Sequence, residues 1–148
     1  MSYNEQDNRQ KRRERLQGVR DAMNQAMGVE MGKLPPQATD LEEAVLGAMM
    51  LEQNAVNTVI DILKPPSFYK EANSRIYEAI IQLFQKGEPV DILTVTQTLR
   101  KMGQLEVIGG PLYIAQLTNR VASTANVETH ARIIAQKFIQ RELIRISN

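Results

Sequence analysis

The sequence lacks cysteine altogether, which excludes a disulfide framework, a thiol nucleophile and any cysteine-ligated metal site. It also lacks an apolar run of the ~20 residues that a membrane-spanning helix requires. Its first residues are polar and charged, unlike a secretion signal. A chain of 148 residues has the length of a single domain. We therefore expect a soluble, cytoplasmic protein that makes no contact with a membrane.

Aromatic residues and an excess of one charge are also scarce. Aromatic side chains make up 5% of the residues and tryptophan is absent, which argues against a stacking platform for single-stranded nucleic acid. The net charge is +1. Residues 1–33 carry seven Lys and Arg against five Asp and Glu, whereas residues 34–148 carry eleven against twelve. Since a domain that grips phosphates has a marked basic surplus, we expect no strong direct binding of nucleic acid.

Catalytic motifs are missing as well. The sequence contains no phosphate-binding loop of the GxxxxGK[ST] type and no GxGxxG. His130 has no cysteine, second histidine or HExxH motif around it, and we interpret it as a surface or helix-packing residue. Glu42 and Glu43 do not favour a pair of catalytic carboxylates, because adjacent residues of a helix point about 100° apart. The sequence therefore predicts no enzymatic activity, no cofactor and no metal site.

Residues 1–33 differ from the rest of the chain in composition. They are rich in Gln, Asn, Arg and Met, and their apolar residues at helical spacing are sparse and interrupted by glycines. These glycines are Gly18, Gly28 and Gly32. The pattern predicts a flexible or partly helical tail, separated by Pro35-Pro36 from a structured domain over 34–148. The tail also contains a basic cluster, which is more typical of a solvated charge run than of a nucleic-acid arm. The cluster consists of Lys11, Arg12, Arg13 and Arg15.

The structured part predicts an all-α fold. Apolar residues recur at helical spacing in six segments, which begin near Thr39, Asn54, Glu71, Asp91, Pro111 and Val127. Thr39 and Glu42 have the spacing of a capping box for the first helix. Asp91 is placed to cap the fourth helix, and Gly87 and Gly103 occupy positions for left-handed C-terminal caps. The stripes predicted to face inward include Phe84 in the third helix and Ile92 in the fourth.

The last predicted helix, which Asn126 is placed to cap, carries two apolar stripes. The core-facing stripe consists of Val127, Ala131, Ile134 and Phe138. The second stripe, rotated by roughly 80–160° from the first, consists of Ala135, Ile139, Leu143 and Ile146. A monomer would expose this second stripe, which favours packing against another chain or a further part of the same chain. Burial on two sides within this domain is the alternative.

We therefore predict a partner-binding surface on the last helix, formed by Ile139, Leu143 and Ile146. Tyr113 and Ile144 are weaker candidates for a partner contact, because both could instead fill the junction between the last two helices.

Short segments between about 35 and 146 occur in an order that resembles the N-terminal domain of the DnaB family of bacterial replicative DNA helicases. They are Pro35-Pro36-Gln37, Leu41–Gly47, Phe68-Tyr69, Gly87–Asp91, Gly103-Gln104-Leu105, Gly109-Gly110, Tyr113-Ile114-Ala115 and Ala125-Asn126-Val127. Each segment alone is weak evidence for the family, whereas their combination in this order is specific to it.

The resemblance implies a six-helix globular bundle followed by the start of a helical hairpin. In this family such domains pair through the hairpin and build a collar on a hexameric ring, the collar binds primase, and the ATPase motor is a separate domain. The chain would then be a non-catalytic module for homo-oligomerisation and primase binding in DNA replication, truncated before the linker and motor. A helicase loader is a further candidate partner.

The alternative reading is a helical DNA-binding regulator with a helix-turn-helix around Gly110. The near-neutral charge and the hydrophobic last helix do not favour it.

Overall fold

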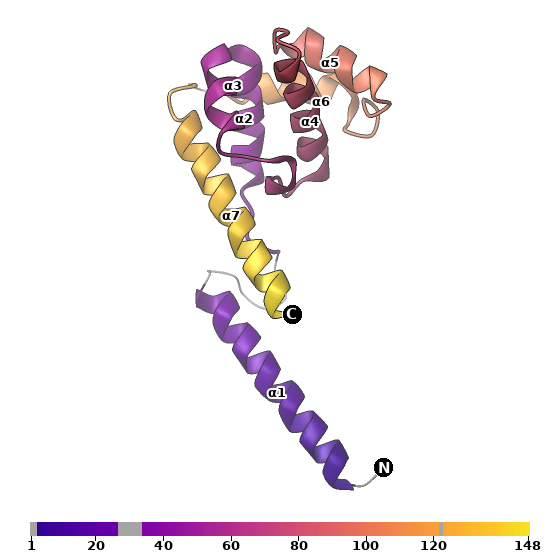
Figure 1. Cartoon of the computed structure of the whole chain (residues 1–148), viewed down its shortest axis with the longest axis vertical. Coiled ribbons are helices and arrows are strands. Elements are labelled where there is room, and N and C mark those ends of the chain that lie inside the picture. The colour runs from indigo at the N-terminus through magenta and orange to yellow at the C-terminus, as the bar shows by residue number, and fades with distance from the viewer. Residues whose placement is uncertain (1–2, 27–33, 122) are drawn as a thin grey trace. The chain divides into compact units, whose positions relative to one another are not determined.

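The computed structural model describes residues 3–26, 34–121 and 123–148, so the interruptions predicted at Gly28 and Gly32 lie outside the described residues. The described residues form helices and no strands (Figure 1). The helices are α1 (Tyr3–Ala26), α2 (Thr39–Leu51), α3 (Gln53–Ile60), the 3₁₀ turn η1 (Pro65–Ser67), α4 (Glu71–Gln85), α5 (Ile92–Lys101), α6 (Gly110–Asn119) and α7 (Val127–Ser147). The predicted all-α class and the six helices after the tail are confirmed.

The chain separates into two units. Gln37–Phe138 forms one unit, here called the head, which holds α2 to α6 and the first part of α7. The second unit comprises Met1–Pro36 and Ile139–Asn148. The buried hydrophobic residues that form the core cluster all lie between Val45 and Ile134.

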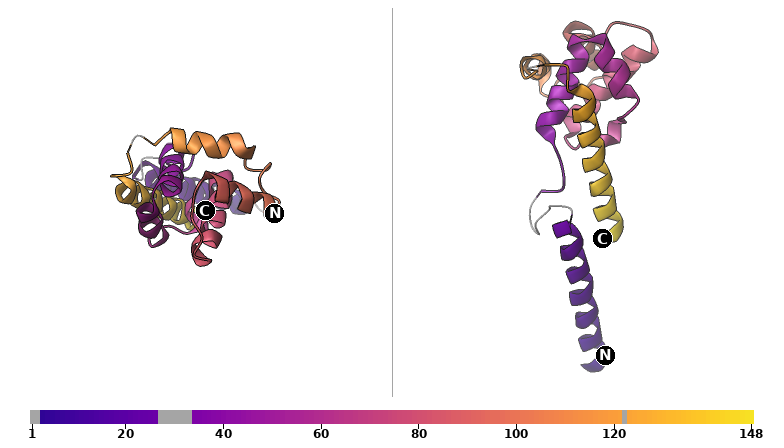
Figure 2. Two further views of the ribbon diagram at one scale, coloured as in Figure 1. Left: turned by 90° about the horizontal axis from the view of Figure 1, so that it is seen from above. Right: turned by 90° about the vertical axis from the view of Figure 1, so that its left-hand side faces the viewer.

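Helix α2 is the centre of the head. It packs against α3, α4 and α6, and α4 in turn packs against α5 (Figures 1 and 2). Between Glu42 and Met50 only Ala44 is not fully buried, as expected for a helix that is covered on all sides. The crossing with α6 requires a glycine, because a Cβ added at Gly47 would lie 2.2 Å from the carbonyl oxygen of Leu117.

The capping signals of α4 and α5 are confirmed. The Asp91 carboxylate accepts a hydrogen bond from the Thr94 backbone N–H at 2.8 Å, and the Thr94 hydroxyl oxygen accepts one from the Asp91 N–H at 2.9 Å. Gly87 and Gly103 follow α4 and α5 with φ angles of 68° and 71°. These left-handed conformations end the helices at the predicted positions.

Two predictions about the inward-facing stripes are wrong. Phe84 is 37% exposed and Ile92 is 39% exposed, although the residues around them in the same stripes, such as Leu83 and Val95, are buried. Phe84 lies in the last turn of α4, and Ile92 is the first residue of α5. Helical spacing places a side chain on a face, but a neighbouring element must still reach the end of the helix to cover it.

The helix in the tail is more continuous than its glycine content suggests. α1 covers 24 residues and passes through Gly18, so the interruption predicted there is wrong. A single glycine inside a helix costs only about 1 kcal/mol relative to alanine, which a long helix tolerates. The flexibility of this tail stays a prediction.

Candidate interaction surface

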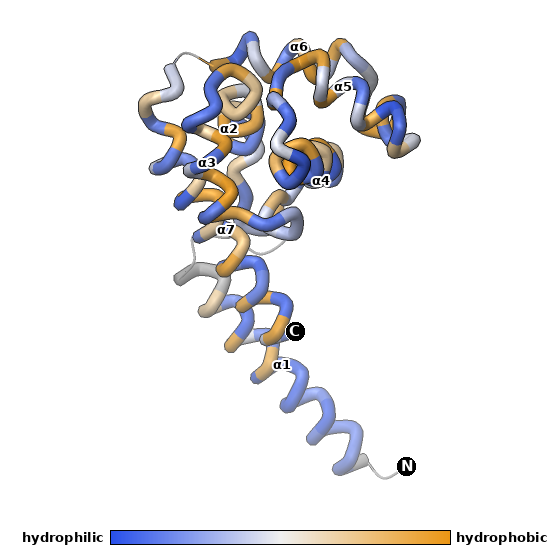
Figure 3. Tube along the Cα trace, turned by 45° about the horizontal axis from the view of Figure 1, so that its top comes forward, coloured by the Kyte–Doolittle hydropathy of each residue, from blue (hydrophilic) through white to orange (hydrophobic). Residues whose placement is uncertain are grey.

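The second apolar stripe of α7 emerges from the head along the last part of that helix. Ala135 still packs against the core, whereas Ile139, Leu143 and Ile146 are 57%, 47% and 72% exposed. Figure 3 shows hydrophobic positions recurring along α7 toward its C-terminal end. Ile144, a further candidate, is half-buried. The stripe predicted from periodicity is thus a row of large apolar side chains that the described part of the chain leaves uncovered.

Polar side chains occupy other faces of this part of α7, and Glu142 borders the stripe directly. The Arg141 guanidinium donates a hydrogen bond to the Pro36 carbonyl oxygen at 2.9 Å. Arg145 forms an ion pair with Glu142 at 2.8 Å, and its hydrogen bonds lower the pKa of that carboxyl group. An apolar strip bordered by charged residues is typical of a helix that packs against a partner along one face.

Tyr113, the other weaker candidate for a partner contact, makes polar contacts within the head. Its hydroxyl donates a hydrogen bond to the Asn73 side-chain oxygen at 2.6 Å and lies 3.3 Å from a Glu43 carboxylate oxygen. The Lys70 ammonium lies 4.4 Å from the centroid of its ring. Burial, reinforced by the Glu43 charge, raises the pKa of Tyr113 well above its usual range. Its polar contacts therefore tie α6 to α2 and α4. They do not indicate that Tyr113 fills the junction between α6 and α7.

The capping box predicted at the start of α2 is wrong. The residue before the helix is Ala38, which makes no side-chain cap, and the Thr39 N–H donates to the Gln37 side-chain oxygen at 3.1 Å. Glu42 is 1% exposed and accepts hydrogen bonds from the backbone N–H groups of Tyr69 and Lys70, at 2.7 Å and 3.3 Å. It therefore caps the N-terminus of α4 instead of its own helix. Such a site suits a carboxylate, since unpaired N–H groups and the helix dipole converge there.

A buried polar network extends from this cap. The Asn73 amide donates to Glu42 at 3.0 Å while its oxygen accepts from Tyr113, so it bridges α2 and α6. Glu43 is 7% exposed and pairs with Arg120 at 3.2 Å. Sequence reasoning missed Asn73 and Arg120 as members of this network. The sequence did contain one indication that a residue from elsewhere caps α4. The segment Tyr69-Lys70-Glu71 includes none of the residues that usually form an N-cap.

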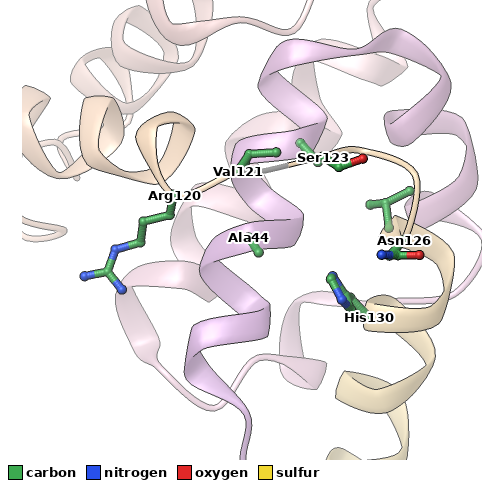
Figure 4. Close-up of a pocket in the computed structure, with 8 residues that line it drawn as sticks. Ala44, Arg120, Val121, Ser123, Asn126 and His130 are labelled. Carbon is green, nitrogen blue, oxygen red and sulfur yellow. The ribbon is translucent and has the colours of Figure 1, made fainter.

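A shallow hollow of about 170 Å³ lies between α2, the loop before α7, and α7 itself (Figure 4). It is lined by Ala44, Ala48, Arg120, Val121, Ser123, Asn126, Val127 and His130. His130 is half-buried here, consistent with its interpretation as a helix-packing residue. Over residues 3–26, 34–121 and 123–148, no three His, Asp or Glu side chains are grouped closely enough to hold a metal ion. No helix in the same ranges has the length and apolarity needed to cross a membrane.

The helix-turn-helix alternative finds no geometric support. The helices on either side of the proposed turn are α5 and α6, and residues 102–109 separate them. A helix-turn-helix joins its helices by about three to four residues.

Comparison with known proteins identifies one family across the head. The model of the DnaB-like helicase N-terminal domain matches residues 34–136. The replicative DNA helicase DnaB of Rhodothermus marinus is 48% identical over 130 residues, which cover 86% of this chain and 14% of that protein. The replicative DNA helicase DnaB of Geobacillus stearothermophilus is 43% identical over 113 residues, which cover 76% of this chain and 25% of that protein. The chain thus spans a quarter or less of the length of these curated relatives.

Two solved structures share the fold of the head. The N-terminal domain of DnaB helicase from Mycobacterium tuberculosis superimposes with a TM-score of 0.74 at 38% identity, covering 76% of this chain and 81% of that one. The N-terminal domain of DnaB helicase from Helicobacter pylori, described together with its interactions with primase, gives a TM-score of 0.64 at 22% identity. It covers 74% of this chain and 85% of that one.

Proposed function

This chain belongs to the family of DnaB-like helicase N-terminal domains, and we propose that it serves as the self-associating, primase-binding module of a replicative DNA helicase. The N-terminal domain of these helicases lacks the ATPase domain, so we expect the chain itself to hydrolyse no ATP. ATP-driven unwinding of DNA is proposed only for a whole protein of this type.

The observation that carries the proposal is the exposed stripe formed by Ile139, Leu143 and Ile146. Covering a large aliphatic side chain fully contributes roughly 1.5–3 kcal/mol. Three such residues in one row therefore leave a substantial gain to any chain that packs along α7. A second copy satisfies this requirement directly, because a two-fold pairing places the same stripe on both sides of the contact. We propose that such pairs are the units from which a hexameric ring is built.

Primase is the proposed second partner. The related domain from Helicobacter pylori has been described with its interactions with primase, and the present head shares its fold. We propose that the same helix, α7, contributes to this contact through Ile144, which points about 100° away from Leu143 around the helix. Tyr113 is a weaker candidate, because its hydroxyl already bonds inward to Asn73. A helicase loader is a further candidate for the same surfaces.

The decisive experiment places charges in the stripe. The double variant Leu143→Asp/Ile146→Asp should remove self-association in multi-angle light scattering, weaken primase binding in a pull-down, or do both. The circular dichroism of the head should be unchanged, since neither residue belongs to the core cluster.

A matched control makes the same chemical change elsewhere. Leu93 and Leu112 are 65% and 69% exposed on α5 and α6, so Leu93→Asp/Leu112→Asp introduces the same charge at exposed apolar sites outside the stripe. This control should leave association intact. Global unfolding of the stripe variant, or unchanged association with an intact fold, would show that the stripe is not the interface.

A further inference from the structure

Helix α1 separates its charges onto opposite faces. At 100° per residue, three of its acidic residues share a sector about 40° wide. They are Asp7, Glu14 and Asp21. The basic residues occupy the other side, together with the exposed apolar residues Leu16 and Val19. They are Arg9, Arg12, Arg13, Arg15 and Arg20, whereas Lys11 lies about 40° from Asp7 and borders the acidic face. Glu5, in the first turn, is the exception.

The two faces neutralise each other very little. Lys11 pairs with Asp7 at 3.0 Å. The other two acidic residues of that face accept hydrogen bonds from glutamine amides, at 3.3 Å and 2.8 Å. Four arginines have no carboxylate within ion-pairing distance anywhere in the part of the chain that the structure describes. They are Arg9, Arg12, Arg13 and Arg15. Their charge is therefore available to an external anion.

Two of these arginines also border a hollow of about 280 Å³ on the surface of α1. It is lined by Gln6, Arg9, Gln10 and Arg13. Residues four apart on a helix are neighbours, with Cβ atoms about 5–6 Å apart. Two guanidinium groups at this spacing can hold a phosphate in a planar, bidentate manner, and glutamine amides supply further donors.

We propose that α1 is an arm that contacts the phosphate backbone of DNA, with Arg9 and Arg13 gripping a phosphate. This departs from the sequence-based interpretation of the basic cluster as a solvated run. Asp7, Glu14 and Asp21 lie on another face of the helix, and Glu5, one turn before Arg9, forms no ion pair with it in the described part of the chain. The phosphate chemistry rests on α1 alone, whereas the choice of DNA rests on the proposed function. A lipid surface fits less well, since membrane-surface helices present a large apolar face with aromatic residues and α1 presents Leu16 and Val19.

The expected affinity is that of non-specific binding, on the order of 10⁻⁴–10⁻⁶ M at physiological salt. This range agrees with the absence of a strong basic surplus in the chain as a whole. The arm would hold DNA near the module without reading its base sequence, because contacts to phosphates carry no sequence information.

The test uses the full 148-residue chain and fluorescence anisotropy. The probes are a labelled thymidine oligonucleotide and a duplex of the same length, each titrated over a series of salt concentrations. In Arg9→Gln/Arg13→Gln, binding should weaken about tenfold, and because one phosphate contact is lost, the slope of log affinity against log salt should fall by about 0.7 on the single strand, or about 0.9 on the duplex. The probe that binds more tightly identifies the form of DNA. Glutamine is a good helix former, so α1 should keep its circular dichroism.

Two further variants sharpen the result. Arg100→Gln/Lys101→Gln removes the same charge from exposed positions on α5 and should bind as the unchanged chain does. Arg9→Lys/Arg13→Lys keeps the charge and should retain most of the binding. An equal loss in the α5 variant, or no loss in the glutamine variant, would overturn the proposal.

The absence of binding to both probes at the lowest salt would also overturn the proposal. Equally tight binding to polyglutamate or to anionic phospholipid vesicles would have the same consequence. Light scattering and primase pull-down on the same glutamine variant should be unchanged. The anisotropy experiment therefore tests the DNA contact of α1 alone. The proposed function is tested separately, by light scattering and by the primase pull-down.

Discussion

The Glu42 carboxylate accepts the backbone N–H of Tyr69 at 2.7 Å and so fastens α2 to the start of α4, across 27 residues of sequence. Its other oxygen accepts from the Asn73 amide at 3.0 Å. Three helices meet through this group, because Asn73 also accepts from Tyr113 on α6. A single buried side chain thus fixes the arrangement of the helices at the centre of the head.

Replacing Glu42 with alanine should lower the free energy of unfolding by about 2–4 kcal/mol. The substitution leaves the buried Asn73 amide and two partly buried backbone donors without their charged acceptor, and the loss of a buried acceptor costs about 1–3 kcal/mol. Urea denaturation followed by circular dichroism measures the change. Glu78 lies on the exposed side of α4, so Glu78→Ala should cost no more than about 0.5 kcal/mol. A Glu42→Ala variant as stable as Glu78→Ala would show that the cap contributes nothing.

The contrast between Asp91 and Glu42 explains which features of the fold were predictable. Asp91 caps the helix that follows it directly, so the residue type and the spacing to Thr94 were sufficient. Glu42 also stands at capping-box spacing from Thr39, yet burial draws its carboxylate to a helix that starts 29 residues later. Local spacing cannot distinguish a cap within one helix from a cap between two helices. Only the packing of α2 against α4 decides it.

The candidate interaction surface shows a similar limit. The exposed row of Ile139, Leu143 and Ile146 follows from helical periodicity alone, and the structure places these side chains where the pattern does. The contacts of Tyr113 could not be predicted from local spacing, because its partners Asn73 and Glu43 lie 40 and 70 residues away in sequence. Periodicity identifies which face of a helix is apolar, but it does not identify what covers that face.

Replacing Gly47 with alanine should destabilise the head by about 1–3 kcal/mol, although alanine is the better helix former. The added Cβ would lie 2.2 Å from the Leu117 carbonyl oxygen and 2.6 Å from a Val121 methyl group, so α2 and α6 would have to separate. Thermal unfolding measures the effect. Gly18→Ala is the matched control, because Gly18 has open space around it in α1 and the same change should increase helix content there. A stabilised Gly47→Ala variant would contradict the close crossing.

Stability should fall in alkaline solution as the buried tyrosines ionise. The Tyr77 hydroxyl donates to the Leu63 carbonyl at 2.7 Å, and burial together with the Asp61 charge raises its pKa well above the usual value of about 10. A group whose pKa is raised on folding contributes stability that is complete below its unfolded pKa, and this contribution is lost as the pH rises towards the folded value. The head should therefore lose stability progressively above about pH 10.

The variant Tyr77→Phe separates this contribution from general alkaline unfolding. It should cost about 1 kcal/mol at neutral pH, through the lost hydrogen bond. Above about pH 10 its stability should decline less steeply than that of the unchanged chain, since one ionising group is gone. Urea midpoints collected across this range test the slope. Parallel declines for both proteins would rule out Tyr77 as a source of the pH dependence.

Deleting residues 1–33 should leave the stability of the head nearly unchanged, within about 1 kcal/mol. Among the described residues, every member of the core cluster lies between Val45 and Ile134, and the described side chains from 4 to 23 are exposed or only half-buried. A helix of this length that lacks a dense apolar stripe adds its own helicity but little to the core of the other unit. Thermal unfolding of the shortened chain measures the change.

The variant Leu46→Ala calibrates this measurement, because removing this fully buried side chain should cost about 2–5 kcal/mol. A loss of more than ~2 kcal/mol on deletion would mean that the tail packs on the head, and the arginine face of α1 would then have to be reinterpreted as part of an internal contact.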